Sequence, residues 1–535
     1  MSVGFGIIEE IHASIVSSRH TLDCDFLADL PTVGDPGAQR EFAELKPGNP
    51  KLTIVHFFNI SLSLREAWLL ISTFRKKYER ESSLESHEQD SMKTSPLLFV
   101  LALIITIAIP VAVHGKSTSP SFVNIPLIRP DGGSEPELSI GPDGTVVFVS
   151  LSWTQFATNA WKALFGQTPA FQGQIDTSLA PGVGGGEDAD VDIGSTGTLH
   201  ATTLLAFFNP QTRITQLGVS AITCTNADFS NSFAHCTSQI IDTTQADRPW
   251  ITSDGVHVYI SYHDSGSSTT IHVQRSDDDG VTFHRVGDPI VGQAGATGNS
   301  TFNNDQGKII ADPVTHNVYD VYASGVGGLQ KGTNANFNNI YVSKSTDMGK
   351  TWTPTLVFSG TPNVALNNVF PDLAADPLSG NLYAGWSDAH SVFLSKSTNQ
   401  GQTWTSPIVV NVAPAITAVF PWIAARGTTV DYVYYGTSAS SKDDPSAIWN
   451  VYMAWSTDGG AHFAQTVVTS HPNHVGVICT NGIGCQRGTR NLLDLFQDAI
   501  NPTNGLAAII YTDDTLTTQS DGSPLPQVAV AYQTS

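Results

Sequence analysis

Short apolar stretches alternate with turns along most of the chain, and the pattern repeats from about residue 117 to the C-terminus. Each repeat begins with an apolar strand, passes through a turn, and continues as a strand rich in Tyr and Val, as in segments 248–262 and 371–386. Repeats of this length, built from strands rather than helices, indicate a β-propeller with one blade per repeat. Seven such units open near Glu135, Asp188, Arg248, Asp305, Phe370, Phe420 and Phe496.

A short polar motif recurs in the third to sixth units. Its pattern is Ser-x-Asp-x-Gly-x-Thr followed by Trp or Phe, with copies about 50 to 70 residues apart, as blades require. In a hairpin turn of this kind the carboxylate accepts backbone N–H bonds, the Gly adopts a positive φ, and the aromatic ring packs beneath the turn. The residues predicted to build the four turns are Ser276, Asp278, Gly280, Ser345, Asp347, Gly349, Trp352, Ser397, Asn399, Gly401, Trp404, Ser456, Asp458 and Gly460.

The last unit ends on its third strand, at 527–532, so its fourth strand has to come from elsewhere in the chain. Residues 122–128 lie just before the first unit and are predicted to pair with the C-terminal strand. This pairing closes the ring and leaves no free sheet edge between the two chain ends. The predicted fold is therefore an all-β propeller of seven blades, with six as the alternative, preceded by a hydrophobic helix.

An uncharged apolar run, Leu97–Val113, precedes the repeats. It is short for a membrane span of about 20 residues and long for the core of a signal peptide. Two interpretations remain open: a signal peptide that starts at Met92, or a membrane anchor with the basic segment 75–80 on its cytoplasmic side. The predicted organisation is 1–91 without an assigned role, absent from the mature protein in the first interpretation, 92–115 as signal peptide or anchor, and 116–535 as the propeller.

The spacing of the cysteines indicates the cellular compartment, and the net charge indicates the class of partner. Cys224 and Cys236 are near neighbours, as are Cys479 and Cys485, so we predict two local disulfides formed in an oxidising compartment. The propeller is accordingly expected outside the cytoplasm, secreted or anchored at the cell surface. The net charge of −22 repels phosphate backbones and argues against nucleic acid as a partner, while cations and neutral polyols are easier to accommodate.

Strand parity predicts which residues share a face. In a four-stranded up-and-down blade the polar motif joins the third and fourth strands on one face. The start of the first strand and the end of the second then lie on the opposite face, and acidic residues gather at those positions. The candidate catalytic residues are Asp188, Asp264 and Asp388; the candidate ligand-binding residues are Asp190, Asp247, Arg248, His263, Asp372, Arg490 and Asp498.

Carboxylates in such a ring can act as acids, bases or ligands of hard cations, so calcium is the cofactor that the pattern suggests, with no metal ligand assigned. The alternative interpretation is that each Asp merely accepts backbone N–H bonds at the start of a strand.

The four motifs, together with the blade openings Asp247–Trp250 and Gly488–Asp494, resemble the sialidase superfamily of Asp-box, or BNR-repeat, propellers, and especially the exported bacterial sialidase-like proteins. Resemblance to a sialidase implies three arginines that grip a carboxylate, a Tyr nucleophile with a Glu partner, and an Asp acid/base. This chain departs from that pattern, because only Arg248 and Arg490 lie at suitable positions and no Tyr–Glu pair can be assigned. The Asp box is specific for the fold and says little about function.

Two functions from different classes follow. The first is a glycan-binding or scaffold module without sialidase chemistry. The second is a glycoside hydrolase or lyase that acts through the acidic residues on a neutral or cationic substrate. The expected partners are a glycan or another polyhydroxylated ligand, and a membrane if the segment Leu97–Val113 is retained.

Overall fold

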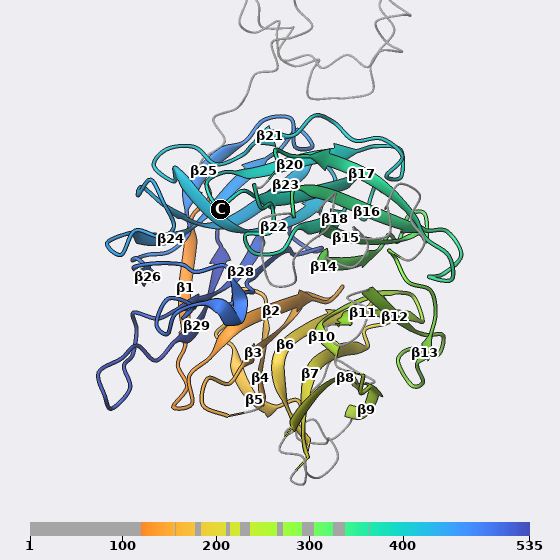
Figure 1. Cartoon of the computed structure of the whole chain (residues 1–535). Helices are drawn as coiled ribbons and strands as arrows, with labels where there is room; N and C mark the ends of the chain where they lie inside the picture. Colours follow the sequence, from red (N-terminus) through yellow and green to blue (C-terminus); the bar gives the residue numbers. More distant parts are fainter. Residues whose placement is uncertain are drawn as a thin grey trace, which may run out of the picture. The chain divides into compact units, whose positions relative to one another are not determined.

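A computed structural model of the chain describes residues 119–155, 157–176, 183–209, 214–224, 236–244, 246–264, 271–290, 304–324, 337–362 and 364–535. Within these ranges the protein is built from β-strands and one short 3-10 helix, η5 (Gly482–Gly484). The strands form seven sheets arranged around a common axis (Figure 1), as predicted. The region 1–91 and the hydrophobic segment Leu97–Val113 lie outside the described residues.

Each sheet is one blade, and its strands follow one another in sequence order. Blade 1 contains β2 (Ser134–Ile140), β3 (Thr145–Leu151), β4 (Thr158–Leu164) and β5 (Ala170–Gln174). Blade 2 contains β6 (Val183–Ile193), β7 (Leu199–Asn209), β8 (Ile214–Cys224) and β9 (Cys236–Asp242). Blade 3 contains β10 (Ala246–Asp254), β11 (His257–Asp264), β12 (Ile271–Ser276) and β13 (His284–Arg285). Blade 4 contains β14 (Asn304–Ala311), β15 (Val318–Ser324), β16 (Asn339–Ser345) and β17 (Thr353–Ser359).

The remaining blades follow the same order. Blade 5 contains β18 (Asp372–Ala375), β19 (Leu382–Ser387), β20 (Val392–Ser397) and β21 (Ile408–Val409). Blade 6 contains β22 (Thr417–Arg426), β23 (Thr429–Thr437), β24 (Ile448–Ser456) and β25 (Ala464–Val467), with the short β26 (His474–Val475) added to β24. Blade 7 contains β27 (Gln497–Ile500), β28 (Ala507–Asp513), β29 (Gln527–Gln533) and β1 (Phe122–Leu127).

Blade 7 closes the ring in the predicted way. Strand β1 pairs antiparallel with β29 along its whole length, from Phe122 opposite Gln533 to Leu127 opposite Val528. The Tyr511 hydroxyl donates to Asn124 Oδ1 at 2.7 Å and ties β1 to the body of the blade. The first strand of each blade contacts the first strands of both neighbouring blades, so these seven strands surround the axis.

The hydrophobic core lies between adjacent blades, because each sheet buries both of its faces. One cluster joins blades 4 and 5 through residues such as Tyr319, Leu373 and Trp386, and another joins blades 1 and 7 through Phe148 and Tyr532. Burial of both faces explains why the second strands read as nearly continuous Tyr- and Val-rich runs rather than as an alternating pattern.

The four polar motifs form the predicted turns between the third and fourth strands. In blade 4, Asp347 accepts hydrogen bonds from Ser345 Oγ (2.9 Å), the Thr351 amide (2.8 Å) and Thr351 Oγ1 (2.7 Å), and Ser345 Oγ accepts from the Gly349 amide. The bonds from the Ser hydroxyl and from the amide four residues further on recur around Asp278, Asn399 and Asp458. The residue before each Gly also has a positive φ, at Asp279, Met348, Gln400 and Gly459. The face that carries these turns is termed the turn face.

The opposite face, where the first strands begin, is termed the mouth face. A β-bulge interrupts the register near the start of the first strand in blades 1, 2, 3, 4 and 6. Glu135, Asp188, Arg248 and Phe420 lie in these bulges with φ between 43° and 57°, a left-handed conformation that is unfavourable for residues with side chains. A bulge re-aims the side chains beside it, so the mouth face is built by a repeated irregularity of the blades.

Candidate functional site on the mouth face

One position of the first strand divides the mouth face into a charged part and an aromatic part. In blades 1 to 6 the position lies two residues before the first regularly paired residue of the strand; in blade 7, where pairing begins at Gln497, the corresponding Phe496 lies one residue before it. In blades 1 to 3 it holds charged residues and in blades 5 to 7 it holds phenylalanines; the residues in blade order are Glu135, Asp188, Arg248, Gly307, Phe370, Phe420 and Phe496. Blade 4 needs glycine there, because a Cβ on Gly307 would lie 1.9 Å from the Pro371 carbonyl oxygen.

Arg248 is the centre of the charged part. Its guanidinium forms an ion pair with Asp305, and Asn367 Nδ2 donates to the other oxygen of Asp305 at 2.8 Å. Burial opposes the charge of Arg248, but the carboxylates of Asp305, Asp247 and Asp188 outweigh that effect and raise its pKa. Arg248 therefore remains a cation held in place by carboxylates.

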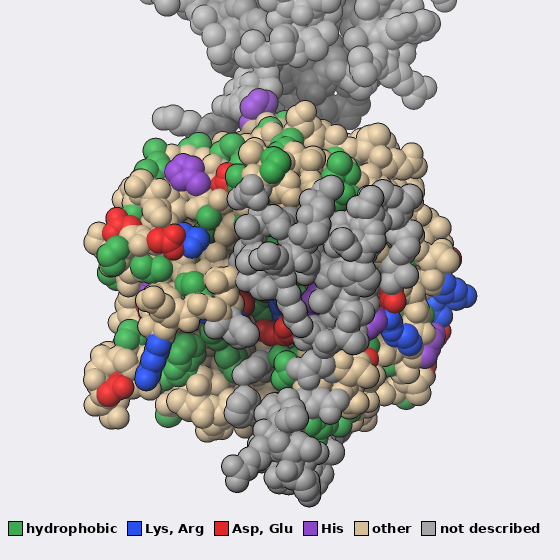
Figure 2. Space-filling view, viewed as in Figure 1, with side chains coloured by type: hydrophobic (Ala, Val, Ile, Leu, Met, Phe, Trp, Pro, Cys, Tyr) green, Lys and Arg blue, Asp and Glu red, His purple; other side chains and the backbone are tan. Residues whose placement is uncertain are grey.

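Arg490 forms a second ion pair on this face, with both carboxylate oxygens of Asp494. The Asp494 amide donates to Glu135 Oε1 at 3.2 Å, which connects blade 7 to blade 1. Burial lowers the pKa of Arg490, but Asp494, Glu135 and Asp188 raise it further than burial lowers it. We term the seven charged residues the mouth cluster: Glu135, Asp188, Asp247, Arg248, Asp305, Arg490 and Asp494. Figure 2 shows acidic and basic side chains close together near the centre of one face.

An aromatic depression adjoins the mouth cluster. It is a shallow depression lined by Phe370, Phe420, Pro421, Trp422, Asp494, Leu495 and Phe496. Arg248 stacks over the ring of Phe370 with its Cζ atom 4.9 Å from the ring centre, so the cluster and the depression share a border. Within the part of the chain that the structure describes, the indole N–H of Trp422 has no hydrogen-bond partner, although Trp422 is only 5% exposed.

A second charged group lies further along the first strands and is almost fully buried. Lys308 Nζ lies 3.3 Å from Asp190 Oδ1 and 3.8 Å from Glu137 Oε2, and above the rings of Trp250 and Trp422. Neither carboxylate oxygen of Glu137 or of Asp498 has a hydrogen-bond partner among the described residues. We term this group the axial cluster: Glu137, Asp190, Lys308, Asp372, Asp431 and Asp498.

The axial cluster contains more acids than one lysine can neutralise. Burial opposes the charge of Lys308, but Asp190, Glu137 and Asp372 outweigh it and raise its pKa. Burial raises the pKa of Asp372 to about 7 and that of Asp431 to about 7, and it holds the pKa values of Glu137 and Asp498 well above their usual range. Part of the cluster is therefore protonated at neutral pH.

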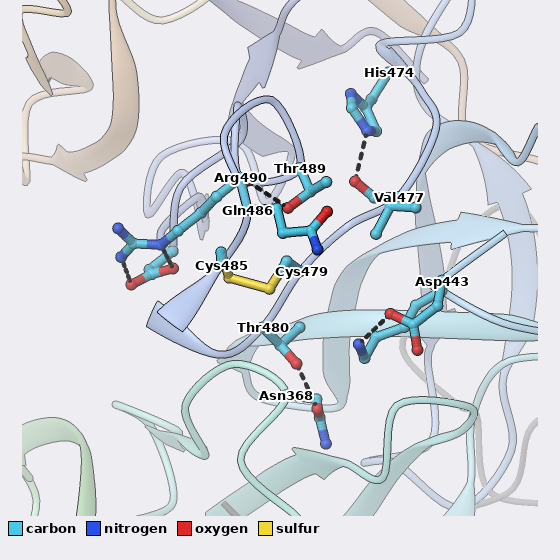
Figure 3. The surroundings of a disulfide bond; sticks show 12 residues. Asn368, Asp443, His474, Val477, Cys479, Thr480, Cys485, Gln486, Thr489 and Arg490 are labelled. Carbon is cyan, nitrogen blue, oxygen red and sulfur yellow. Dashed lines mark hydrogen bonds and ion pairs between the residues drawn. A yellow bond between two sulfur atoms is a disulfide. The ribbon is translucent and has the colours of Figure 1, made fainter. Parts of the chain in front are cut away.

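A disulfide-closed loop supports one side of the mouth cluster (Figure 3). Cys479 and Cys485 are bonded, and the Cys479 amide donates to the Thr489 carbonyl at 2.8 Å, directly before Arg490. Thr480 Oγ1 donates to Asn368 Oδ1 at 2.8 Å, which fastens the loop to the residues before β18. The second predicted disulfide, Cys224–Cys236, joins β8 to β9. Both pairings are confirmed, and paired cysteines are typical of proteins that fold in oxidising compartments.

The structure separates the predicted acidic ring into groups. Asp188, Asp247, Arg248 and Arg490 belong to the mouth cluster, whereas Asp190, Asp372 and Asp498 are buried in the axial cluster. Asp388 accepts the His390 and Ser391 amides, the bonding expected of a residue that stabilises a turn. His263 is buried opposite Asp247. Asp264 ends β11, and its side chain lies outside the described residues.

The candidate set made from the sequence omitted Lys308, the cation that partly balances the axial cluster. Lys308 follows Gly307 in the bulge of β14, where an isolated lysine looks like a solvent-exposed strand residue. Lys308 could have been found from the acidic residues at the neighbouring blade openings, because several buried carboxylates require a compensating cation.

Among the described residues, no three His, Cys, Asp or Glu side chains are arranged so that they could hold a metal ion. In the same part of the chain, no helix combines the length and apolar character needed to cross a membrane.

No protein-family model and no curated protein matches this chain. Solved structures with a similar fold include a PL25 ulvan lyase bound to a GlcA(1-4)Rha3S saccharide, with a TM-score of 0.46, 10% identity, and coverage of 76% of this chain and 95% of that chain. They also include an α-L-arabinofuranosidase mutant from Fusarium graminearum, with a TM-score of 0.41, 12% identity, and coverage of 78% and 98%. A microbial sialidase has a TM-score of 0.38, 12% identity, and coverage of 75% and 66%. At this level of identity the likeness concerns the fold alone.

Proposed function

We propose that this protein is an Asp-box propeller of the sialidase-like type that binds carbohydrate on its mouth face, outside the cytoplasm. The observation that carries the proposal is the division of one structural position into charged residues in blades 1 to 3 and phenylalanines in blades 5 to 7. A sugar ring has the matching chemistry, because its C–H face packs on aromatic side chains while its hydroxyl groups exchange hydrogen bonds with charged and amide groups.

The depression provides the groups for such contacts. Phe420, Phe496 and Trp422 line it but are only 2–5% exposed, so the apolar contact they offer is limited to ring edges, and Asp494 offers carboxylate oxygens at the border. Because Arg490 already holds Asp494, the carboxylate is oriented before a ligand arrives. Groups that are ordered in advance lose less conformational freedom on binding.

Glycoside cleavage is the second candidate function, and the left-handed backbone of Glu135 and Asp188 favours it. Strained non-glycine residues concentrate at sites where their placement matters for function. Two carboxyl groups on either side of a glycosidic bond are the usual machinery of such enzymes. Asp188 keeps its role as the candidate acid or base, now with Glu135 and Asp494 as the carboxylates beside it.

A glycan array probed with the full-length protein, with and without calcium, tests binding. The matched variants are Asp188→Asn in the mouth cluster and Asp143→Asn, which removes one charge from the turn face. We expect the array to retain at least one glycan. Asp188→Asn should bind that glycan about tenfold more weakly, and Asp143→Asn should bind it with unchanged affinity. Fluorogenic glycosides separate the two functions: an enzyme is indicated if Asp188→Asn abolishes turnover while the glycan still binds. Retention of no glycan in either condition, with no turnover, would contradict the proposal.

A further inference from the structure

We propose that the disulfide Cys479–Cys485 is a redox switch that holds part of the mouth face in place. It closes a loop within the segment 478–492, which lies between β26 and β27 and which we term the flap (Figure 3). Reduction of this disulfide releases the flap, loosens Arg490 and uncovers the aromatic part of the mouth face. The inference goes beyond the proposed function, because it concerns how this face is held and not what binds there.

The two disulfides of the propeller differ in how well they are protected. Cys224 and Cys236 lie opposite each other in the sheet of blade 2, and Cys224 is 1% exposed. Cys479 and Cys485 are half-buried in a stretch of turns that includes the short helix η5. The exposed residues around Cys485 are Asn481, Gly484, Gln486, Arg487 and Gly488. A thiolate must reach a sulfur atom to cleave a disulfide, so the flap disulfide is the one expected to be reduced first.

The disulfide and a few short-range hydrogen bonds close the base of the flap. The Cys479 amide donates to the Thr489 carbonyl at 2.8 Å, and the amide and Oγ1 of Thr489 both donate to the Gln486 carbonyl, at 3.1 and 2.8 Å. Without the covalent link the loop gains conformational freedom, and these hydrogen bonds alone have to offset the additional entropy. The closed state of the base therefore depends on the disulfide.

The closed flap covers the aromatic part of the mouth face. Ile478 and Leu492, at the two ends of the flap, are each 2% exposed and belong to the same hydrophobic cluster as Phe370, Phe420 and Trp422. The three rings are themselves only 4–5% exposed. Displacement of the base moves Ile478 and Leu492 apart, so it exposes apolar surface that the closed flap keeps from water.

Arg490 connects the flap to the mouth cluster. Its backbone directly follows Thr489, which the closed base holds, and its guanidinium binds both carboxylate oxygens of Asp494. The Asp494 amide in turn donates to Glu135 of blade 1. Opening of the base therefore loosens the Arg490–Asp494 ion pair and makes the peptide bond after Arg490 accessible to a protease.

The redox step is a thiol–disulfide exchange with a dithiol reductant. A thiolate of the reductant attacks one sulfur of Cys479–Cys485, the S–S bond breaks, and a mixed disulfide forms. The second thiolate of the reductant then displaces the protein sulfur from the mixed disulfide. Two electrons and two protons pass from the dithiol to the protein, which is left with two cysteine thiols, and the reductant leaves as a disulfide.

Graded dithiothreitol tests the order of reduction on the full-length protein. Iodoacetamide then alkylates the thiols, which removes the remaining reductant, and mass spectrometry of peptides identifies the modified cysteines. We expect Cys479 and Cys485 to be alkylated at a dithiothreitol concentration about tenfold lower than Cys224 and Cys236. Simultaneous reduction of the two pairs, or earlier reduction of Cys224–Cys236, would overturn the inference.

Trypsin tests the release of the flap, on protein in which Cys479 and Cys485 alone of the four have been alkylated. We expect cleavage after Arg490 to be about tenfold faster than in the oxidised protein, since proteolysis follows the population of the open state. Cleavage after Lys350, in an exposed turn of blade 4, is the reference and should keep its rate. Equal rates of cleavage after Arg490 in both redox states would show that polar contacts alone hold the flap, and the switch would be refuted.

Two double variants assign the effect to one disulfide. Cys479→Ser with Cys485→Ser should give fast cleavage after Arg490 without any reductant and no further response to dithiothreitol. Cys224→Ser with Cys236→Ser should keep the slow cleavage of the oxidised protein; fast cleavage here as well would indicate general loosening of the ring and contradict the inference. The reduction series on the unmodified protein decides if the flap variant does not fold. None of these measurements needs a carbohydrate, so their outcome is independent of the proposed function.

Discussion

The pKa values of carboxylates on the turn face and in the axial cluster are shifted in opposite directions. Asp347 and Asp278 accept hydrogen bonds from amides and hydroxyl groups of their own turns. Burial, the largest single effect on Asp347, would raise its pKa, but the hydrogen bonds together outweigh it, and the pKa values of both residues are lowered. Asp372 and Asp431 are fully buried, and burial raises the pKa of each to about 7. Aspartate side chains are therefore held in the ionised state on the turn face, whereas burial favours their protonated state near the axis.

The difference lies in where the hydrogen-bond donors come from. A turn supplies its own donors within four residues, so its carboxylate is satisfied as soon as the turn forms. The axial carboxylates come from different blades, and Lys308 is the cation that the structure places among them. Their charge is balanced only when the ring has closed.

The largest effect is expected from Lys308→Met. The variant leaves the axial carboxylates without their cation, and removal of one partner from a buried ion pair costs about 3–5 kcal/mol. Chemical denaturation should show that loss at pH 8 and a smaller loss at pH 5, where more of the acids are protonated. Lys350→Met, at an exposed site in a turn of blade 4, is the control and should change stability by less than about 0.5 kcal/mol. Equal stability of the two variants at pH 8 would contradict the assigned role of Lys308.

The unmodified protein should be most stable on the acidic side of neutrality. The folded-state pKa values of Asp372 and Asp431 lie above the unfolded value, so their stabilising effect is complete below about pH 4 and is lost as the pH rises through about 7. The turn carboxylates behave in the opposite way, and their contribution is lost as the pH falls below the unfolded value. Unfolding curves from pH 3 to 9 should show a maximum near pH 4–5 and a loss of about 2 kcal/mol by pH 8. A maximum at pH 7 or above would be incompatible with buried, protonated axial acids.

A smaller effect is expected on the turn face. Asp347→Ala removes the acceptor of three hydrogen bonds and should lower the free energy of unfolding by about 1–2 kcal/mol. Asp347→Asn should cost less than about 0.5 kcal/mol, because Asn399 at the same position in blade 5 accepts from Ser397 Oγ and the Thr403 amide and donates its Nδ2 to Thr403 Oγ1. Thermal unfolding measures both, and glycan binding should be unaffected by either. Equal losses in the two variants would show that the charge, rather than the acceptor geometry, stabilises the turn.

The smallest effect is expected from Asp498→Asn. Asp498 is 4% exposed, its two carboxylate oxygens have no hydrogen-bond partner among the described residues, and it is close enough to Asp431 and Asp372 for them to raise its pKa further. Loss of its charge should raise stability by about 1 kcal/mol at pH 8 and change it little at pH 5. The stability of Asp498→Asn is therefore measured at both pH values. Destabilisation at both would contradict the excess of negative charge in the axial cluster.

The blade architecture could be predicted from the sequence because its determinants are local. The strand–turn–strand repeat marks seven units, Ser-x-Asp-x-Gly places a hairpin turn, and the missing fourth strand of the last unit leaves 122–128 to close the ring. Which residues share a face follows from counting strands, and the two cysteine pairs are close in sequence. None of these inferences depends on a distance between residues of different blades.

The tertiary structure decided how deeply each acidic residue lies and what it meets. Asp188 and Asp190 are two residues apart, yet a bulge places the first in the mouth cluster and the second, fully buried, beside Lys308 from blade 4. Asp388 looked equivalent to both and instead accepts the amides of its own turn. Burial and charge pairing depend on contacts among first strands from separate blades, which come together only when β1 pairs with β29 and the ring closes.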